Sequence, residues 1–411
     1  MLIKKEVLTL IKLGNSNRLF IVPIIVIVVL GLILMTAILP MVKMSPKNVP
    51  IGLVVADEGE MGAPLAEALL TNAPELVKFT QYDSVEKLED AMDDREVYGA
   101  LVLSADFSSK VATLQTEAPE KATVQIYINE GANATVSTLV QTALTNMATV
   151  LNTQLSTQML TAVQGKTDEM KQQLAPVLQA QGEGSPLAQV GAMISPIQPS
   201  KVQDFANPIQ TEVIKVHETG NLANAPIAFL SISWIASLIG AVMLYLVGNK
   251  RPFASKGDKL KFNTLQSIMP FVYALIAGYV FTWYSTWVLG FEFEHFNRVA
   301  LYIAICVAAF TLMIFATLRW LKLPSIAIFV LLMFFSMAAV QMAPEMMPAF
   351  YRDYIVSWLP LRIYADGLKE VLFFSQDVIN SYSMILIWII VVALVLVWIK
   401  NLIEKTETKQ S

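Results

Sequence analysis

The spacing of the long apolar runs constrains this 411-residue chain more than any other feature. A helix needs about 20 apolar residues to cross the hydrocarbon core of a bilayer. The chain has six apolar runs of about this length: Leu19–Leu39, Pro226–Val247, Ile268–Leu289, Val299–Leu318, Leu323–Met342 and Val378–Ile399. Nearly half of the chain separates the first run from the second, and the other four follow closely. The sequence therefore predicts a polytopic α-helical membrane protein with six transmembrane helices in a one-plus-five layout and a polar domain inserted after the first helix.

Composition excludes a soluble protein. Of all residues, 55% are hydrophobic and only 15% are charged, whereas soluble domains carry about 25% charged residues. Helices on the surface of a soluble protein also need a polar face, and these runs have almost none. The bilayer is therefore the expected surrounding of the apolar runs.

Lysine and arginine in the short connections predict the orientation, because cytoplasmic loops are enriched in them. Every second connection is basic, which places both termini in the cytoplasm and the large polar domain outside the plasma membrane. The basic residues lie before the first apolar run and after the second, fourth and sixth runs. They are Lys4, Lys5, Lys12, Arg18, Lys250, Arg251, Lys256, Lys259, Lys261, Arg319, Lys322, Lys400, Lys405 and Lys409.

The charge balance differs between the two parts of the chain. Residues 43–220 hold 22 acidic and 11 basic residues, a net charge of −11, and the remainder of the chain has a net charge of +7. An acidic outer domain repels the phosphate backbone of a nucleic acid, so no nucleic-acid partner is expected. Residues 38–42 offer no small-x-small cleavage site, so the first run is expected to remain as an anchor.

The runs divide the chain into segments. The expected organisation is an amphipathic cytoplasmic helix at 1–18, a first transmembrane helix at 19–42, an extracytoplasmic domain at 43–225, a five-helix transmembrane domain at 226–400 and a cytoplasmic tail at 401–411.

Strand and helix patterns alternate in residues 43–133, which predicts an inserted α/β or α+β domain. Strands are expected near Pro50–Val55, Leu76–Gln81, Gly99–Leu103 and Thr123–Asn129, and short helices at Met61–Leu70, Ser84–Met92 and Asp106–Leu114.

Residues 134–181 are expected to form the helical part of this domain. Apolar residues recur at three- or four-residue steps from Ala134 and predict a long amphipathic helix that continues to about Val163. Either a partner helix or its own domain could cover the apolar stripe. Residues 182–225 are expected to be a linker and the return to the membrane, because 182–208 are rich in Gly, Pro, Ser and Gln.

The sequence shows no motif that is typical of an enzyme active site or a metal site. Cys306 is the single cysteine, and the two histidines, His217 and His295, are far apart, so neither a disulfide nor a structural zinc site is expected. Gly165-Lys166-Thr167 resembles the end of a phosphate-binding loop, but Leu160 stands where that motif needs glycine. We expect no cofactor in this chain and an energy source in another subunit.

Three stretches, in this order, resemble the type-2 ABC-transporter permeases, and within them the phage-infection-protein (Pip or YhgE-like) family. They are Val49–Gly59, then Tyr98–Phe107 followed by Asn129–Asn133, and finally Leu359–Lys369. The entry to the second apolar run, Asn221–Tyr245, is also similar to that family.

The resemblance implies an export permease that works as a homodimer or heterodimer with a cytoplasmic ABC ATPase, which would supply ATP. In such permeases an N-terminal elbow helix and the cytoplasmic loop after the second span touch the ATPase; here these are residues 1–18 and Gly248–Ser267. The candidate coupling residues are Lys4, Lys5, Lys12, Lys250, Arg251, Lys256, Lys259 and Lys261, although topogenic charge alone would also place them there. The alternative function is a non-transporting surface receptor or secretion-system scaffold acting through the outer domain.

Residues 343–377 hold prolines and charged residues among apolar ones, so they are not a simple span. The resemblance implies a re-entrant helical pair. Asp366 has the helical spacing to pair with Arg362 or Lys369, and a role in the cargo path is the alternative. The candidates for this segment are Arg362, Tyr364, Asp366, Gly367, Lys369 and Glu370.

Small residues at four-residue spacing predict close helix contacts in the membrane. The candidate pairs are Ser233 with Ser237, Ala236 with Gly240, and Ala274 with Gly278.

Overall fold

A computed structural model describes residues 46–114, 116, 118–181, 205–248, 251, 253 and 255–403, together with residue 32. The chain divides into two compact units, with Pro46–Glu218 in one and Thr219 onward in the other. The first apolar run, Leu19–Leu39, lies outside the described residues except for Leu32, and the six-span layout therefore stays a prediction.

The unit formed by Pro46–Glu218 is built on a mixed sheet. Its described strands are β1 (Val49–Val55), β2 (Val77–Tyr82), β3 (Gly99–Leu103), β4 (Ala122–Asn129) and β5 (Ile209–Val216), in the order β2-β1-β3-β4-β5. β1 pairs in parallel with β2 and β3, β4 is antiparallel to β3, and β5 is parallel to β4. Four of these strands match the predicted positions, and β5 is an addition.

Helices cover both faces of this sheet, as the alternation of side chains along its strands requires. One face packs on α4 (Val85–Asp93), whose Leu88 and Met92 join Val54 and Val102 in a buried cluster. Ser84 caps this helix by accepting a hydrogen bond from the backbone N–H of Lys87, which stabilises the first turn.

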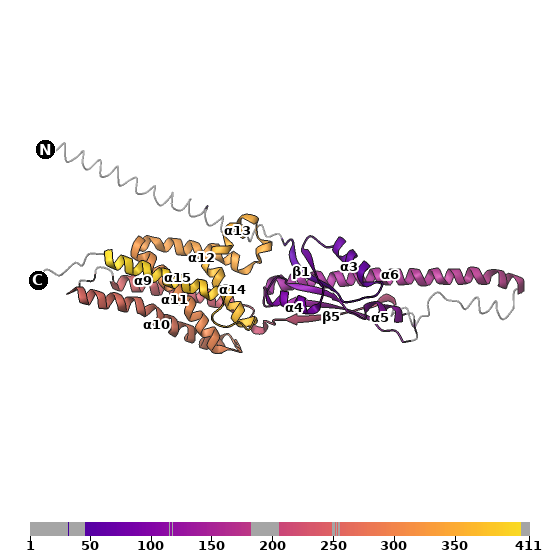
Figure 1. Cartoon of the computed structure of the whole chain (residues 1–411), viewed down its shortest axis with the longest axis horizontal. Coiled ribbons are helices and arrows are strands. Elements are labelled where there is room, and N and C mark those ends of the chain that lie inside the picture. The colour runs from indigo at the N-terminus through magenta and orange to yellow at the C-terminus, as the bar shows by residue number, and fades with distance from the viewer. Residues whose placement is uncertain are drawn as a thin grey trace, which may run out of the picture. The chain divides into compact units, whose positions relative to one another are not determined.

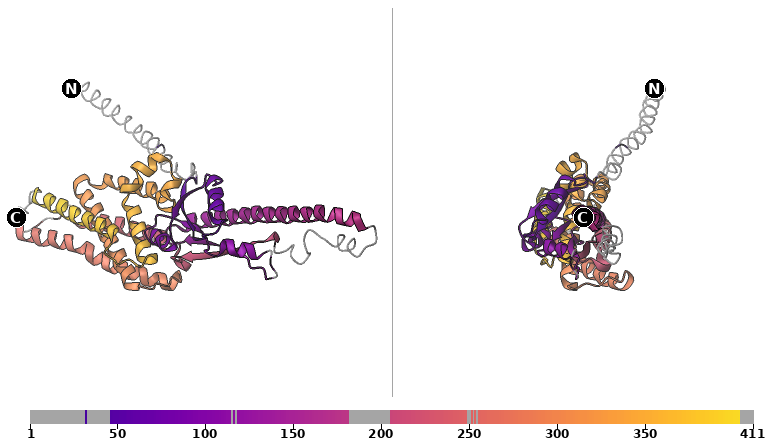
Figure 2. Two further views of the ribbon diagram at one scale, coloured as in Figure 1. Left: turned by 45° about the vertical axis from the view of Figure 1, so that its right-hand side comes forward. Right: turned by 90° about the vertical axis from the view of Figure 1, so that its right-hand side faces the viewer.

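The long helix α6 (Ala134–Gln181) covers the opposite face. A Cβ placed on Gly99 of β3 would lie 2.7 Å from Cγ1 of Val140, which shows how closely the helix approaches the strand. Its stripe of buried side chains runs from Val136 to Met159, so its own domain covers the apolar stripe that the sequence predicted. α6 continues 18 residues beyond Val163, where the apolar pattern was expected to end, and covers the whole segment 134–181 that was expected to be helical. Figures 1 and 2 show it extending well past the strands.

Two short helices flank α6 on the same face. α3 (Gly62–Thr71) lines a groove with the part of α6 between Leu139 and Gln154. α5 (Phe107–Thr113) lines a second hollow with the part between Leu155 and Ala162. The carboxylate of Asp57, at the end of β1, joins this layer to the sheet because it accepts a hydrogen bond from the backbone N–H of Ser108 at 3.0 Å.

The unit from Thr219 onward is helical. Its described elements are η2 (Gly220–Leu222), α9 (Ala225–Gly248), α10 (Lys256–Val288), α11 (Phe296–Leu321), η3 (Leu323–Ser325), α12 (Ile326–Gln341), η4 (Pro344–Met346), α13 (Ala349–Tyr354), η5 (Val356–Trp358), α14 (Pro360–Phe373) and α15 (Ser381–Ile403). Among the described residues, five helices are long and apolar enough to cross a membrane: α9, α10, α11, α12 continued from Leu323, and α15. Five of the predicted runs are thus helical.

Helix α11 forms the centre of this unit. It contacts α9, α10, α14 and α15. In its most apolar stretch of 18 residues 83% are buried, against 22% in the corresponding stretch of α15. Figure 1 shows α9, α10, α11 and α15 running in a similar direction, with α14 crossing near one end. The more exposed apolar faces of the other helices are what contact with lipid requires.

The connection between α9 and α10 is shorter than the predicted Gly248–Ser267 loop. α10 begins at Lys256, after Ser255, whose hydroxyl oxygen accepts a hydrogen bond from the backbone N–H of Asp258 at 3.1 Å. This N-cap starts the helix before the apolar run begins. Residues 256–267 of the predicted cytoplasmic connection are therefore helical and continuous with the apolar part of α10.

Candidate functional site

Helix α14 carries an unusual group of charges into the interior of the helical unit. Pro360 occupies the first helical turn, where a proline is tolerated because its missing N–H would have no partner. Almost every following residue, from Leu361 to Lys369, is buried. A helix buried on all sides while carrying three charged residues must satisfy those charges internally.

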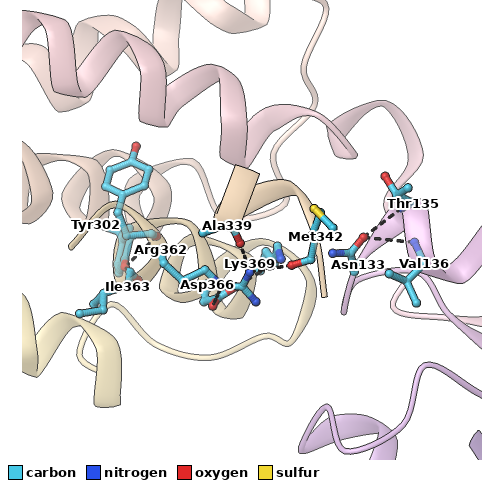
Figure 3. A network of polar contacts seen from close by, with 11 residues as sticks. Asn133, Thr135, Val136, Tyr302, Ala339, Met342, Arg362, Ile363, Asp366 and Lys369 are labelled. Carbon is cyan, nitrogen blue, oxygen red and sulfur yellow. Dashed lines mark hydrogen bonds and ion pairs between the residues drawn. The ribbon is translucent and has the colours of Figure 1, made fainter. Parts of the chain in front are cut away.

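The charges satisfy one another through Asp366. Its Oδ2 atom accepts a hydrogen bond from Nε of Arg362, and its Oδ1 atom lies 3.3 Å from Nζ of Lys369. All three residues are only 7% exposed. Figure 3 shows the three side chains converging from successive turns of α14. The spacings of four and three residues put them on one helix face, as the sequence predicted.

Arg362 also binds the end of a neighbouring helix. Its Nη1 atom donates to the backbone oxygen of Ala339 and, at 2.9 Å, to that of Met342, as Figure 3 shows. These carbonyls lie at the C-terminus of α12 (Ile326–Gln341), where the last backbone oxygens have no partner within the helix. The guanidinium therefore caps α12 and places a positive charge at the negative end of its dipole.

Two tyrosines fix the position of α14 against α11 and α9. The hydroxyl of Tyr302, on α11, donates to the backbone oxygen of Tyr364 at 3.1 Å. The hydroxyl of Tyr364 lies 3.3 Å from that of Ser233 on α9. Both tyrosines are fully buried, so these polar contacts fix α14 among otherwise apolar neighbours.

Gly367 permits this close approach. A Cβ atom at this position would overlap the Tyr302 hydroxyl and would lie 2.6 Å from Cβ of Tyr382. The absence of a side chain at Gly367 therefore lets the aromatic residues reach the helix backbone. Glu370, the last candidate in this segment, is half-buried at the next turn.

The coupling candidates lie elsewhere. Lys256 and Lys261 are exposed and Lys259 is half-buried on the first turns of α10. The guanidinium of Arg251 lies over the ring of Phe262, 4.6 Å from its centroid, which attaches the connection to α10 by a cation–π contact. The other candidates, Lys4, Lys5, Lys12 and Lys250, lie outside the described residues.

Small residues make close contacts at some of the predicted positions. Ser233 and Ser237 are buried on α9, and Ala274 is buried on α10. A Cβ at Gly278 would overlap the backbone oxygen of Ala300 on α11. Ala236 is half-buried, and no described atom of a neighbouring element lies within 4 Å of a Cβ placed on Gly240, so the described part of the chain makes no close helix contact at Gly240.

The sequence did not point to some residues that position the site. Tyr302 and the carbonyls of Ala339 and Met342 belong to other helices, so no local spacing indicates them. Gln266 on α10 donates to the backbone oxygen of Leu244 near the C-terminus of α9 at 2.7 Å. A glutamine near the start of an apolar run was the only available signal for this contact. Over the described residues, no group of three or more His, Cys, Asp or Glu residues could hold a metal ion.

Comparison with known proteins identifies the family. A family model described as "ABC-2 family transporter protein" matches residues 18–399. No curated protein and no solved structure matches the chain significantly. Members of this family are membrane components rather than catalytic subunits, and they normally work with an ATPase partner. The match spans both units and all five apolar helices described above, and the chain therefore belongs to the ABC-2 transporter family as a multi-pass membrane permease.

Proposed function

We propose that this chain is the membrane-spanning subunit of an ABC exporter, energised by a separate cytoplasmic ATPase and acting as a homodimer or heterodimer. The observation that carries the proposal is the family match over residues 18–399 of a chain whose helical unit holds five apolar helices. The likeness of Val49–Gly59 and Leu359–Lys369 to the phage-infection-protein (Pip or YhgE-like) family supports a place in that subfamily.

The first turns of α10 are the proposed contact with the ATPase. The helix has 33 residues and is about 50 Å long at 1.5 Å per residue, whereas the hydrocarbon core is about 30 Å thick. The excess length lets the N-terminal turns, with Lys256, Lys259 and Lys261, protrude from the bilayer. The positive-inside bias supports a cytoplasmic position for them, and residues 1–18 would add the elbow helix.

The charge cluster of α14 is the proposed anchor of the re-entrant segment at 343–377. Arg362 links this helix to the end of α12, and Tyr302 links it to α11. A rigid charge network of this kind transmits a displacement of one helix to its neighbours because packed helices do not deform independently. We propose that α14 keeps the extracytoplasmic ends of these helices together during transport.

A surface receptor or scaffold that acts through the unit formed by Pro46–Glu218 is the second candidate. The independent sheet and core of that unit support it. The two functions differ in one requirement, because only the exporter needs an ATPase.

Affinity purification of the tagged chain from its native membranes, solubilised in mild detergent, separates the two functions. The exporter predicts a stoichiometric subunit with a phosphate-binding loop among the copurified proteins. Purification of the chain with no such subunit, after chemical crosslinking before solubilisation, would favour the receptor.

A further inference from the structure

The groove between α3 and α6 has the size and chemistry of a ligand site. It has a volume of about 500 Å³, within the range of small-molecule sites. Its walls are largely apolar, with Leu69 and Leu76 on one side and Leu139, Met147 and Val150 on the other. Val150 is 56% exposed, so this apolar wall is open to solvent in the described structure.

The groove is free of charge. Its polar lining residues are Asn72, Thr142, Asn146 and Gln154, which are all neutral at any physiological pH. This neutrality extends along α6, since no charged residue occurs from Gly131 to Gly165. The remainder of residues 43–220 is strongly acidic. An uncharged groove in an acidic domain disfavours the binding of a charged peptide or a nucleotide and favours the binding of an apolar molecule.

The shape of the groove restricts that molecule further. The groove follows α6 from Leu139 to Gln154, about 22 Å at 1.5 Å per residue. A second hollow, of about 530 Å³, lies further along α6 at Leu155, Met159 and Ala162, and the acidic Glu60 is among its other lining residues. An elongated, uncharged groove of this length fits an unbranched hydrocarbon better than a compact ring system.

We propose that the groove between α3 and α6 binds the acyl chain of a lipid. The apolar walls bury the methylene groups, each of which gains from leaving water, and the amides of Asn72 and Asn146 lie where they can donate to an ester or carboxyl oxygen. The proposal rests on the proposed exporter function, for which it names an acylated lipid as the class of cargo that the outer domain receives.

Adjacent positions on α6 provide a matched pair of variants. Val150 lines the groove, whereas Thr149 is exposed, lies about 100° further around the helix, and donates to the backbone oxygen of Thr145. Val150→Glu places a carboxylate on the apolar wall, and Thr149→Glu adds the same charge outside the groove. Both replacements introduce a good helix former at an exposed position, so neither is expected to unfold the unit.

The test is photolabelling of the full-length protein in nanodiscs with palmitic acid that carries a terminal diazirine. The label should appear in peptides containing Leu69, Met147 or Val150, and excess unlabelled palmitate should compete with it. In Val150→Glu the label in these peptides should fall at least about tenfold, because burying an uncompensated carboxylate against hydrocarbon is unfavourable. In Thr149→Glu it should stay within about twofold of wild type.

Labelling of the apolar helices serves as the internal standard, because their lipid contact does not depend on α6. Equal labelling of Val150→Glu and wild type would overturn the proposal, as would an equal loss in both variants or a lack of label between residues 62 and 162. The experiment contains no ATPase. A negative labelling result would therefore not contradict the proposed exporter function. In the same way, failure to find an ATPase would not contradict lipid binding in the groove.

Discussion

The Nζ atom of Lys369 lies 3.3 Å from Oδ1 of Asp366, on the carboxylate oxygen opposite the one that Arg362 binds. One acidic side chain therefore compensates two cations in the interior of the helical unit. Arg362 also donates to two backbone oxygens at the end of α12, so it contributes to the capping of that helix as well as to the ion pair.

Asp366→Ala should strongly destabilise the protein. It leaves two buried cations without their carboxylate, and the loss of one partner from a buried ion pair costs about 3–5 kcal/mol. Thermal unfolding of the detergent-solubilised protein, followed by circular dichroism, measures the change. If Asp366→Ala is as stable as wild type and only transport is lost, Asp366 belongs to the cargo path instead.

The second substitution that rescues Asp366→Ala should depend on which cation it removes. Adding Lys369→Met should recover part of the loss, because it removes one of the two buried cations that lose their carboxylate partner. Adding Arg362→Met should recover less, since it also deprives the α12 carbonyls of their donor. Equal rescue by both would show that the capping of α12 contributes little.

Gly367→Ala should destabilise the helical unit by about 1–3 kcal/mol, the usual cost of overpacking a core. The new methyl group would collide with Tyr302 and Tyr382. Gly240→Ala is the matched control, because no described atom lies within 4 Å of the new methyl there and alanine is the better helix former. Similar melting temperatures for the two variants would contradict the packing found around Gly367.

The orientation of the chain can be tested by cysteine accessibility. In a Cys306→Ala background, Ser109→Cys should react with a membrane-impermeant maleimide in intact cells, because the alternating basic flanks put this residue outside. Gly257→Cys should react only after permeabilisation. Both positions are exposed. Labelling of Gly257→Cys in intact cells without labelling of Ser109→Cys would therefore reverse the predicted membrane topology.

Periodic and apolar segments could be predicted from the sequence, and weakly patterned ones could not. The five described apolar helices and strands β1 to β4 carry either long apolar runs or buried side chains. Strand β5 is an edge strand with residues 210–213 exposed, so it shows no period of two. The last part of α6 has polar residues such as Lys166 and Asp168 in place of an apolar stripe, so the apolar periodicity indicates the helix only as far as about Val163.

The candidate site shows the same division. The spacing of Arg362, Asp366 and Lys369 is local, so helical geometry predicts that they share a face. The partners Tyr302 and Ala339 lie 64 and 27 residues from Asp366 in the sequence, so only the fold brings them to α14, as the contacts of Tyr364 and Arg362 show. The proximity of Gly367 to Tyr302 depends on this tertiary arrangement as well.

The basic turns of α10 should govern the association with an ATPase. Replacing Lys256, Lys259 and Lys261 with Glu should reduce copurification of the ATPase at least about tenfold, because like charges at an interface repel. Replacement of all three with Arg keeps the charge and should preserve the complex. Accessibility of Ser109→Cys must be unchanged in the Glu variant, since the same charges also direct insertion. Unchanged copurification in a correctly inserted Glu variant would remove these turns from the interface.

The most direct measurement of the central claim is ATP hydrolysis by the complex purified from native membranes and placed in nanodiscs. The account predicts vanadate-sensitive hydrolysis that copurifies with the wild-type chain, persists in the Arg variant of α10 and falls to background in the Glu variant. A wild-type chain that is pure, folded and correctly inserted, yet brings no ATP-hydrolysing subunit with it, would contradict the assignment of this protein as the permease of an ABC exporter.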